Sequence, residues 1–341
     1  MLTTLTHRSM ACEFVVMLPP SDAPLLDAAF AALECLDAIE ANLTVYRPDS
    51  EISQVNSNAD KRWVPVSPTT FELIEQSIRW SEQTGGAFDI TAGPLIRTWG
   101  FLTRQGKKPT RDEVEAALET VGYQHLRTCP ETHSIRFAKP GMEINLGAIG
   151  KGFALDQLAG RLVQAGIKNF LLHGGGSSVL ARGNQSPVDN LSDEPESRAG
   201  WAVGIAHPTK PNLRLAGIRL IDAALSTSGS GKQFFHHRGK RFGHVIDPRT
   251  GYPAGEMLSL TAICPNATDA EACSTASFLS PMDELECLFA EPAESAPTAR
   301  TLKQADAMIA TVPRNRQDEV EVTSWGEILW IDPPQLRQSD P

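Results

Sequence analysis

The residues best suited to chemistry lie in one segment, Glu143-Ile-Asn-Leu-Gly-Ala-Ile-Gly-Lys-Gly-Phe-Ala-Leu-Asp156. An apolar, strand-like run from Glu143 to Leu146 is followed by three glycines (147, 150 and 152) and then by a helical pattern. A strand, a glycine turn and a helix in this order bring backbone N–H groups and the positive end of a helix dipole to one point, where phosphates bind. Lys151 adds a cation, and Asn145 and Asp156 lie on either side. Glycine turns before helices are common, so a phosphate site and a purely structural turn both remain open.

Two phosphate-binding motifs are excluded by their spacing. A P-loop requires G-x-x-x-x-G-K-[ST], but Asn145 occupies its first glycine position and Gly152 follows Lys151 where a hydroxyl residue is needed. The later Gly229-Ser-Gly-Lys232 fails because Ser226 occupies the first glycine position. The glycine spacing at 147, 150 and 152 also differs from the G-x-G-x-x-G of dinucleotide-binding turns.

Oxygen ligands for a metal could come from Thr268-Asp-Ala-Glu271-Ala-Cys-Ser-Thr275. Glu271 and Thr275 are four residues apart and so share one helix face. A carboxylate and a hydroxyl are donors that Mg²⁺ accepts, and Mg²⁺ commonly accompanies phosphates. The alternative is structural, because Thr268 and Glu271 have the spacing of a capping box and Glu271 could bond only to its own helix N-terminus.

One histidine is a better candidate for chemistry than its neighbours. His244 enters an apolar strand just before Asp247, which suits an acid, a base or a phosphate contact. His236 and His237, next to Arg238, are typical of a solvent-exposed hairpin tip.

Composition excludes several classes of protein. The chain has 341 residues and a net charge of −10, which argues against a nucleic-acid partner because phosphate backbones need a basic surface. We expect no membrane span, because no stretch approaches the ~20 apolar residues that one requires. Six scattered cysteines without a C-x-x-C indicate reduced thiols, and the N-terminus has no signal-peptide pattern, so we expect a cytoplasmic protein.

The elements that must position these residues are helices early in the chain and strands later. Helical patterns cover Leu25–Leu43, Thr70–Gln83 and Arg111–Val121, and the last opens with the capping box Thr110-Arg-Asp-Glu113. Strand-like runs are Phe14–Leu18, Ser134–Phe137, Phe170–Leu172, Val179–Ala181, Trp201–Ile205, Leu215–Ile221, Ser259–Cys264, Met308–Val312 and Glu327–Ile331.

This order predicts an α+β fold with largely antiparallel sheets flanked by helices. The length suits one large domain or two intimately joined ones, and we expect this folded unit to cover residues 1–332. The polar, acidic stretch 184–200 is predicted to be a mobile insertion, and 333–341 a frayed tail.

The order of several motifs resembles the ApbE family, the FAD:protein FMN transferases. Met10-Ala-Cys resembles the family's opening M-G-T, and Tyr46-Arg-Pro-Asp-Ser-Glu51 resembles its Y-x-x-x-S-E. Gly86–Pro94 matches G-x-F-D-x-T-x-x-P, and Asn145–Asp156 resembles D-L-G-G-I-x-K-G-Y-A-x-D. His244–Gly251 matches H-x-I-D-P-x-T-G in full. The resemblance extends from about residue 10 to 312.

The resemblance implies an activity and a set of site residues. FAD would bind in a cleft with Mg²⁺, and a threonine or serine hydroxyl of an acceptor flavoprotein would attack the FMN phosphorus and release AMP. His244 would be the catalytic imidazole, with Asp247 beside it. The residues expected at FAD are Met10, Tyr46, Ala87, Phe88, Asp89, Asn145, Lys151 and Ile246. The metal site would consist of the Ala148 carbonyl, Glu271, Ser274 and Thr275.

Three positions depart from the family pattern. Asn145 and Glu271 stand where the family usually carries Asp, and Gly231-Lys232 stands near a position that is commonly aromatic. Two alternative functions therefore accompany the transferase hypothesis. One is an FAD pyrophosphatase, in which water replaces the acceptor hydroxyl, and the other is a non-catalytic FAD-binding paralogue.

Overall fold

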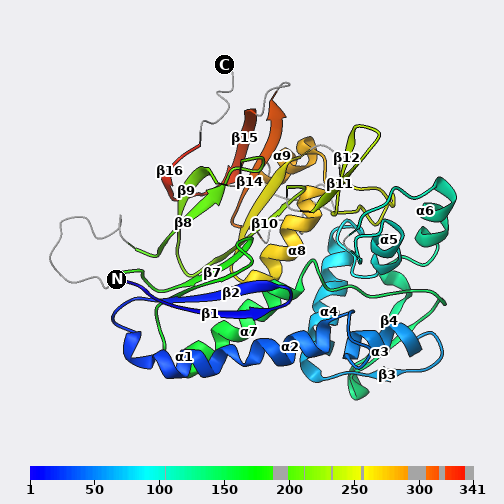
Figure 1. Cartoon of the computed structure of the whole chain (residues 1–341), viewed down its shortest axis with the longest axis horizontal. Helices are drawn as coiled ribbons and strands as arrows, with labels where there is room; N and C mark the ends of the chain where they lie inside the picture. Colours follow the sequence, from blue (N-terminus) through cyan, green and yellow to red (C-terminus); the bar gives the residue numbers. More distant parts are fainter. Residues whose placement is uncertain are drawn as a thin grey trace.

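A large antiparallel sheet forms the centre of the computed structural model, which describes residues 1–103, 105–186, 199–210, 212–231, 233–254, 257–290, 305–314 and 319–334 (Figure 1). In spatial order its eight strands are β1 (Thr3–Ser9), β2 (Cys12–Leu18), β6 (Phe170–Gly174), β7 (Ser178–Arg182), β10 (Ala224–Gly229), β13 (Ser259–Cys264), β14 (Ala307–Arg314) and β15 (Glu319–Gly326). Every neighbouring pair is antiparallel. The predicted α+β fold with antiparallel sheets is confirmed.

Three smaller sheets accompany the large one. The first contains β8 (Trp201–Ala206), β9 (Arg214–Leu220) and β16 (Trp330–Asp332), the second β3 (Val64–Pro65), β4 (Leu126–Cys129) and β5 (Ser134–Phe137), and the third is the hairpin of β11 (Phe234–His237) and β12 (Lys240–Gly243). The predicted hairpin tip is confirmed at Arg238, where the φ of 50° turns the chain between β11 and β12.

The helices of the described residues are α1 (Leu26–Leu33), α2 (Cys35–Leu43), α3 (Glu51–Asn58), α4 (Pro68–Gln83), α5 (Gly93–Thr98), α6 (Arg111–Leu118), α7 (Gly150–Gln164), α8 (Ala267–Phe278) and α9 (Met282–Ala290), with short 3₁₀ turns at Ala23–Leu25, Tyr123–His125 and Pro130–Thr132. Helices α7 and α8 pack against each other and against the large sheet. They carry Lys151 and Glu271, so this packing sets the distance between two predicted site residues.

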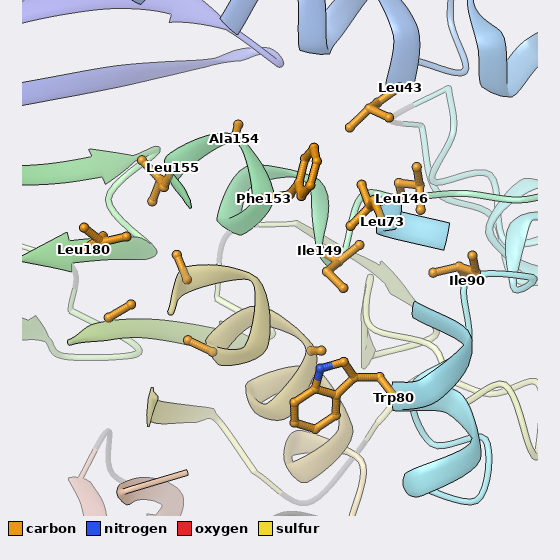
Figure 2. Close-up of a cluster of buried hydrophobic side chains, with 14 of the residues drawn as sticks. Leu43, Leu73, Trp80, Ile90, Leu146, Ile149, Phe153, Ala154, Leu155 and Leu180 are labelled. Carbon is orange, nitrogen blue, oxygen red and sulfur yellow. The ribbon is translucent and has the colours of Figure 1, made fainter. Parts of the chain in front are cut away.

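The two faces of the large sheet bury different cores. Because side chains alternate along a strand, Leu172 and Leu180 face the helices while Leu171 and Val179 face the β8–β9–β16 sheet. On the helical side, Phe153 and Leu155 of α7 belong to one buried cluster with side chains from other helices and from β7 (Figure 2). The first turns of α7 are therefore anchored by apolar packing.

One predicted helix and one predicted strand differ from the structure in their extent. The helix predicted over Leu25–Leu43 is divided at Glu34 into α1 and α2. The strand predicted at Glu327–Ile331 forms only at its end, in β16. The predicted capping box of α6 is confirmed, because Thr110 and Glu113 each bond to the backbone N–H of the other.

The predicted insertion at 184–200 and the predicted tail at 333–341 lie largely outside the described residues, which omit 187–198 and 335–341. Across the part of the chain that is described, no helix has the length and apolar character needed to cross a bilayer.

Candidate functional site

The glycine segment begins helix α7 but is not preceded by a strand. Glu143 forms only an isolated bridge with Ala92, so the strand predicted over Glu143–Leu146 is wrong. The physical reason is that the side chain of Asn56 forms the backbone hydrogen bonds that a neighbouring strand would otherwise form. It accepts from the Ile144 N–H at 2.7 Å and donates to the Ile144 carbonyl at 2.9 Å. Helix α7 then starts at Gly150 without a side-chain cap. The Gly150 N–H donates to the Leu146 carbonyl at 2.8 Å, so in this first turn the N–H groups of Lys151 and Gly152 are the ones suited to an anion.

Lys151 and Glu271 meet where α7 crosses α8. The Nζ atom of Lys151 lies 2.5 Å from Oε1 of Glu271, and the hydroxyl of Ser178 donates to the same oxygen at 2.5 Å. Glu271 is only 3% exposed in its side chain, whereas Lys151 is 26% exposed. The second carboxylate oxygen, Oε2, is buried and has no hydrogen-bond partner among the described residues. A buried oxygen that is left unpaired is costly, so this atom is suited to a cation.

The capping-box interpretation of Glu271 is wrong. Helix α8 is capped by Asn266, whose side chain accepts from the Asp269 N–H at 2.8 Å. The Thr268 hydroxyl donates to Asp156, which also accepts from the Thr268 N–H at 2.8 Å. Asp156 thus fixes the start of α8 against α7, and Glu271 is left free for the contact with Lys151.

Two further predicted metal ligands lie on the same helix as Glu271. The hydroxyl of Ser274 is 3.0 Å from that of Ser228 and donates to the Glu271 carbonyl at 3.1 Å, while the Thr275 hydroxyl is 3.3 Å from Ser228. Ala148 is exposed in the turn before α7. In the described part of the chain, no group of three His, Cys, Asp or Glu residues could hold a metal. Any cation here would depend on one carboxylate with hydroxyl and carbonyl oxygens, a donor set that fits Mg²⁺.

His244 directly follows β12 and keeps one ring nitrogen bound to the backbone. Its Nδ1 lies 3.2 Å from the carbonyl of Gln233. A carbonyl only accepts, so Nδ1 carries the proton of the neutral ring and Nε2 holds the lone pair. Burial lowers the pKa of His244 below its ordinary value of 6.5; the Gln233 carbonyl acts in the opposite direction and the positive charge of Lys151 in the same direction.

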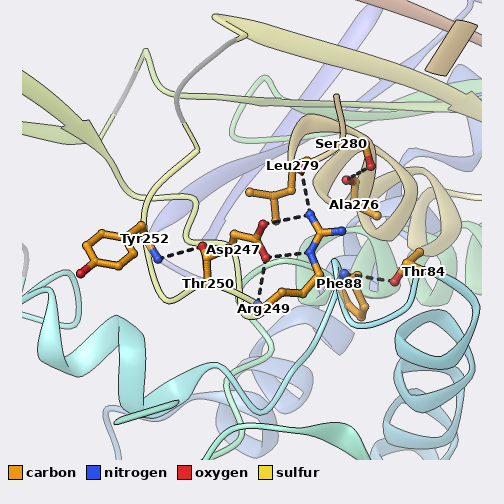
Figure 3. Close-up of polar contacts among 9 residues, drawn as sticks. All are labelled: Thr84, Phe88, Asp247, Arg249, Thr250, Tyr252, Ala276, Leu279 and Ser280. Carbon is orange, nitrogen blue, oxygen red and sulfur yellow. Dashed lines mark hydrogen bonds and ion pairs between the residues drawn. The ribbon is translucent and has the colours of Figure 1, made fainter. Parts of the chain in front are cut away.

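Asp247 is bound to Arg249 and not to His244 in the contacts of the structure. The guanidinium of Arg249 donates to both carboxylate oxygens at 2.9 Å and also to the Leu279 carbonyl at 2.9 Å, at the end of α8 (Figure 3). The turn that follows His244 is therefore fastened to α8. A catalytic role for Asp247 stays a prediction.

The residues of the Gly86–Pro94 motif are largely buried. Asp89 accepts from the N–H and hydroxyl of Thr91 at 2.8 and 2.7 Å and from the Tyr123 N–H at 2.8 Å. Burial raises the pKa of Asp89, and these hydrogen bonds oppose the shift. The Phe88 N–H is held by Thr84 at 3.1 Å (Figure 3). Ala87 is 2% exposed, so contact of this motif with FAD stays a prediction.

Tyr46 and Asn145 line a shared cavity of about 240 Å³. Tyr46 is 64% exposed, and the Asn145 side chain accepts from the Gly147 N–H at 2.9 Å. Met10 lies at the β1–β2 turn and packs on the main core, and Ile246 is buried in a separate cluster. The structure thus brings Lys151 and Glu271 together, and it brings Tyr46 and Asn145 together. Within the described part of the chain, no hydrogen bond or ion pair joins these two pairs.

Sequence reasoning missed Ser178 and Asn56. The motif His173-Gly-Gly-Gly-Ser-Ser178 signals backbone that approaches other groups closely, but nothing in it shows that Ser178 would reach Glu271. Asn56 lies in α3, and its bonds to Ile144 span 88 positions. Neither contact is local in the sequence, so the spacing of residue types along the chain could not predict it.

Known proteins are similar to this chain over most of its length. The model of the ApbE family matches residues 6–296. The chain is 33% identical over 281 residues to the FAD:protein FMN transferase of Escherichia coli (strain K12), covering 80% of this chain and 77% of that protein. It is 32% identical over 252 residues to the protein of the same name from Haemophilus influenzae, covering 72% and 70%.

Solved structures share the fold. The ApbE protein of Thermotoga maritima has a TM-score of 0.78 with this chain at 26% identity, covering 92% of this chain and 94% of that one. The apo form of the flavinyl transferase ApbE from Pseudomonas stutzeri has a TM-score of 0.75 at 23% identity and covers 95% of both chains.

Proposed function

Because this chain belongs to the ApbE family, we propose that it is an FAD:protein FMN transferase. The reaction joins the oxygen of an acceptor threonine or serine to the FMN phosphorus and breaks the bond between that phosphorus and the oxygen of AMP. FMN becomes attached to the acceptor through a phosphoester, and AMP leaves with the former bridging oxygen. The acceptor hydroxyl loses one proton, so a base is needed near the phosphorus.

The observation that carries the proposal is the crossing of α7 and α8. It combines an uncapped helix start, the ammonium of Lys151 and the buried carboxylate of Glu271. A helix start and a lysine are suited to the diphosphate of FAD, because N–H groups and a positive charge offset its negative charge. When a phosphate is present, Lys151 can turn from Glu271 toward it without leaving the site.

His244 supplies the base. Its Nε2 is free to accept the hydroxyl proton because Nδ1 is bound to the Gln233 carbonyl. The lowered pKa keeps the ring neutral near neutral pH, which is the state that can accept a proton. The positive charge of Lys151 contributes to this lowered pKa.

The residues present also fit Mg²⁺. Glu271 would hold the ion through its unpartnered Oε2, with Ser274, Thr275 and the Ala148 carbonyl as further donors. When bound, Mg²⁺ would neutralise negative charge on the phosphate oxygens and so favour the attack of an oxygen nucleophile. Asn145 and Tyr46 would contact the rings or ribityl chain of FAD in their shared cavity.

The test uses purified protein with FAD, Mg²⁺ and a threonine-bearing acceptor flavoprotein. The expected products are an acceptor that carries flavin fluorescence after denaturing electrophoresis and an equimolar amount of AMP, both abolished by a chelator. AMP and free FMN formed without acceptor would indicate a pyrophosphatase. FAD bound without any AMP would indicate a non-catalytic binding protein. The variant His244→Ala should bind FAD and lose turnover.

A further inference from the structure

Two segments of this acidic chain are purely basic. Residues 90–111 contain five Lys or Arg and residues 223–246 contain four, and neither segment contains an Asp or Glu. The whole chain carries 41 Asp and Glu against 31 Lys and Arg. The positive charge is therefore concentrated, and the remaining sequence is more acidic than the net charge of −10 suggests.

Aromatic packing joins the two segments. Phe235 stacks on Phe242 within the β11–β12 hairpin, with centroids 5.4 Å apart. From the other segment, Phe101 and Trp99 contact Phe235 at 5.8 and 6.3 Å. Gly106 packs so closely on the Phe235 ring that a Cβ atom there would lie 2.5 Å from it. The loop after α5 and the hairpin thus pack together, and we call their exposed basic residues, Lys108, Arg238 and Lys240, the basic hairpin surface.

Two ammonium groups of this surface share one ring. The Nζ atoms of Lys108 and Lys240 lie 5.9 and 5.6 Å from the centroid of Phe242. Both side chains are exposed, and the described residues provide no carboxylate that forms an ion pair with either. Lys107, by contrast, is paired with Glu113 at 3.3 Å. Cation–π attraction holds both charges near the ring, and their mutual repulsion makes an external anion favourable there.

The basic hairpin surface adjoins the proposed base. His244 follows β12 directly, and its ring lies 6.4 Å from that of Phe101. A segment bound on this surface would therefore be next to His244. In the proposed function the FAD phosphates would bind at the start of α7, which leaves this surface for the second substrate.

We propose that the basic hairpin surface binds a negatively charged segment of the acceptor protein and presents the acceptor hydroxyl to His244. This inference rests on the proposed function, since it names the acceptor chemistry of that site. A positive surface on an otherwise acidic protein directs an acidic partner to one place, because the rest of the molecule repels it.

The test measures peptide binding in the absence of turnover. Two fluorescein-labelled peptides contain the same central threonine, one flanked by Asp and Glu and the other by Asn and Gln at the same positions. By fluorescence anisotropy at low salt, the wild-type protein should bind the acidic peptide about tenfold more tightly than the amide peptide, and high salt should remove the difference. The variant Lys108→Glu/Lys240→Glu should lose this preference.

A matched control separates local from global charge. Lys61→Glu/Lys168→Glu changes the net charge by the same amount at exposed positions outside the two basic segments and should keep the preference. FAD affinity, measured by flavin fluorescence, should change less than about twofold in both variants. The proposal is overturned if the two peptides bind equally, if the control loses the preference as well, or if the Lys108→Glu/Lys240→Glu variant loses FAD and keeps the acidic peptide. Because binding is measured without catalysis, a chain that lacked transferase activity could still give the expected result.

Discussion

The ammonium of Lys151 neutralises the buried carboxylate of Glu271 where helices α7 and α8 cross, although the two residues are 120 positions apart in the chain. The Nζ–Oε1 distance is 2.5 Å, and the Ser178 hydroxyl donates a hydrogen bond to the same oxygen. A carboxylate with a 3% exposed side chain would be unfavourable without a positive partner. In the proposed function, Mg²⁺ at the second oxygen, Oε2, would be a further positive partner of the same carboxylate.

The variant Lys151→Met should show how far Mg²⁺ can substitute for the ammonium as a positive partner of Glu271. Without divalent cations its free energy of unfolding should fall by about 2 kcal/mol, less than for a fully buried pair because Lys151 is partly exposed. If Mg²⁺ binds at Glu271 as proposed, it should stabilise the variant more than wild type, since the carboxylate of the variant has lost the positive charge of Lys151. Urea denaturation with a chelator and with Mg²⁺ measures both effects. The double variant Lys151→Met/Glu271→Gln serves as the control and should not respond to Mg²⁺; an equal Mg²⁺ response in all three proteins would contradict the role of Glu271.

His244 should make the folded state sensitive to acid. Its pKa in the folded protein is lowered, chiefly by burial, so the unfolded chain binds the proton first as the pH falls. The stability associated with the neutral ring is thus complete above about pH 6.5 and is lost as the pH falls toward the folded pKa. The pKa of His173 is also lowered by burial, so wild type must be compared with His244→Gln. The difference between their urea-denaturation curves at successive pH values isolates His244, and NMR titration of the imidazole checks the direction. A ring that titrates at or above 6.5 would contradict the prediction.

Local patterns predicted much of the fold, and contacts between distant segments account for what they missed. Strands β5 and β13 were predicted with their observed ends, because each is a short run of strand-forming residues that is closely followed by a proline. The division of the first helix at Glu34 interrupts no helical period and leaves no mark in the sequence. At the site, the residue types at 145–156 and 271–275 indicated an anion and a cation site, but the pairing of Lys151 with Glu271 depends on how α7 and α8 pack. That packing is a tertiary property, so spacing along the chain could not reveal it.

The β1–β2 turn should tolerate glycine better than its present residue. Met10 and Ala11 have φ values of 49° and 57°, as a two-residue turn of type I′ requires, and Ala11 occupies the position of the family's glycine. Glycine adopts this conformation without a clash of its Cβ, so Ala11→Gly should raise the free energy of unfolding by about 0.5 kcal/mol after the larger entropy of its unfolded chain is counted. The control is Ala31→Gly on the exposed side of α1, which should lower it by about 1 kcal/mol. Urea denaturation of the two variants tests the sign, and a loss of stability in Ala11→Gly would show that the turn is not strained.

The two glycines at 152 and 160 lie on the same helix and should respond oppositely to alanine. A Cβ atom at Gly152 would collide with the Ala267 carbonyl and lie 2.9 Å from the Thr268 nitrogen, where α8 begins. At Gly160 the same atom would meet nothing within 4 Å. Gly160→Ala should therefore raise the free energy of unfolding by about 1 kcal/mol through helix propensity alone. Gly152→Ala should lower it by about 2–3 kcal/mol, because α8 must move away from α7.

The distance between α7 and α8 links this difference to function. At the start of α8, the Thr268 N–H donates to the Asp156 carboxylate of α7 at 2.8 Å. The same two helices are joined by the contact of Lys151 with Glu271. If α8 shifts to accommodate the Cβ atom in Gly152→Ala, the affinity for Mg²⁺ should fall at temperatures where the variant is still folded, while Gly160→Ala keeps wild-type affinity. Titration calorimetry with Mg²⁺ on both variants measures this directly, with circular dichroism to confirm folding. Equal Mg²⁺ affinity in a folded Gly152→Ala would show that the cation site does not depend on the close approach of the two helices.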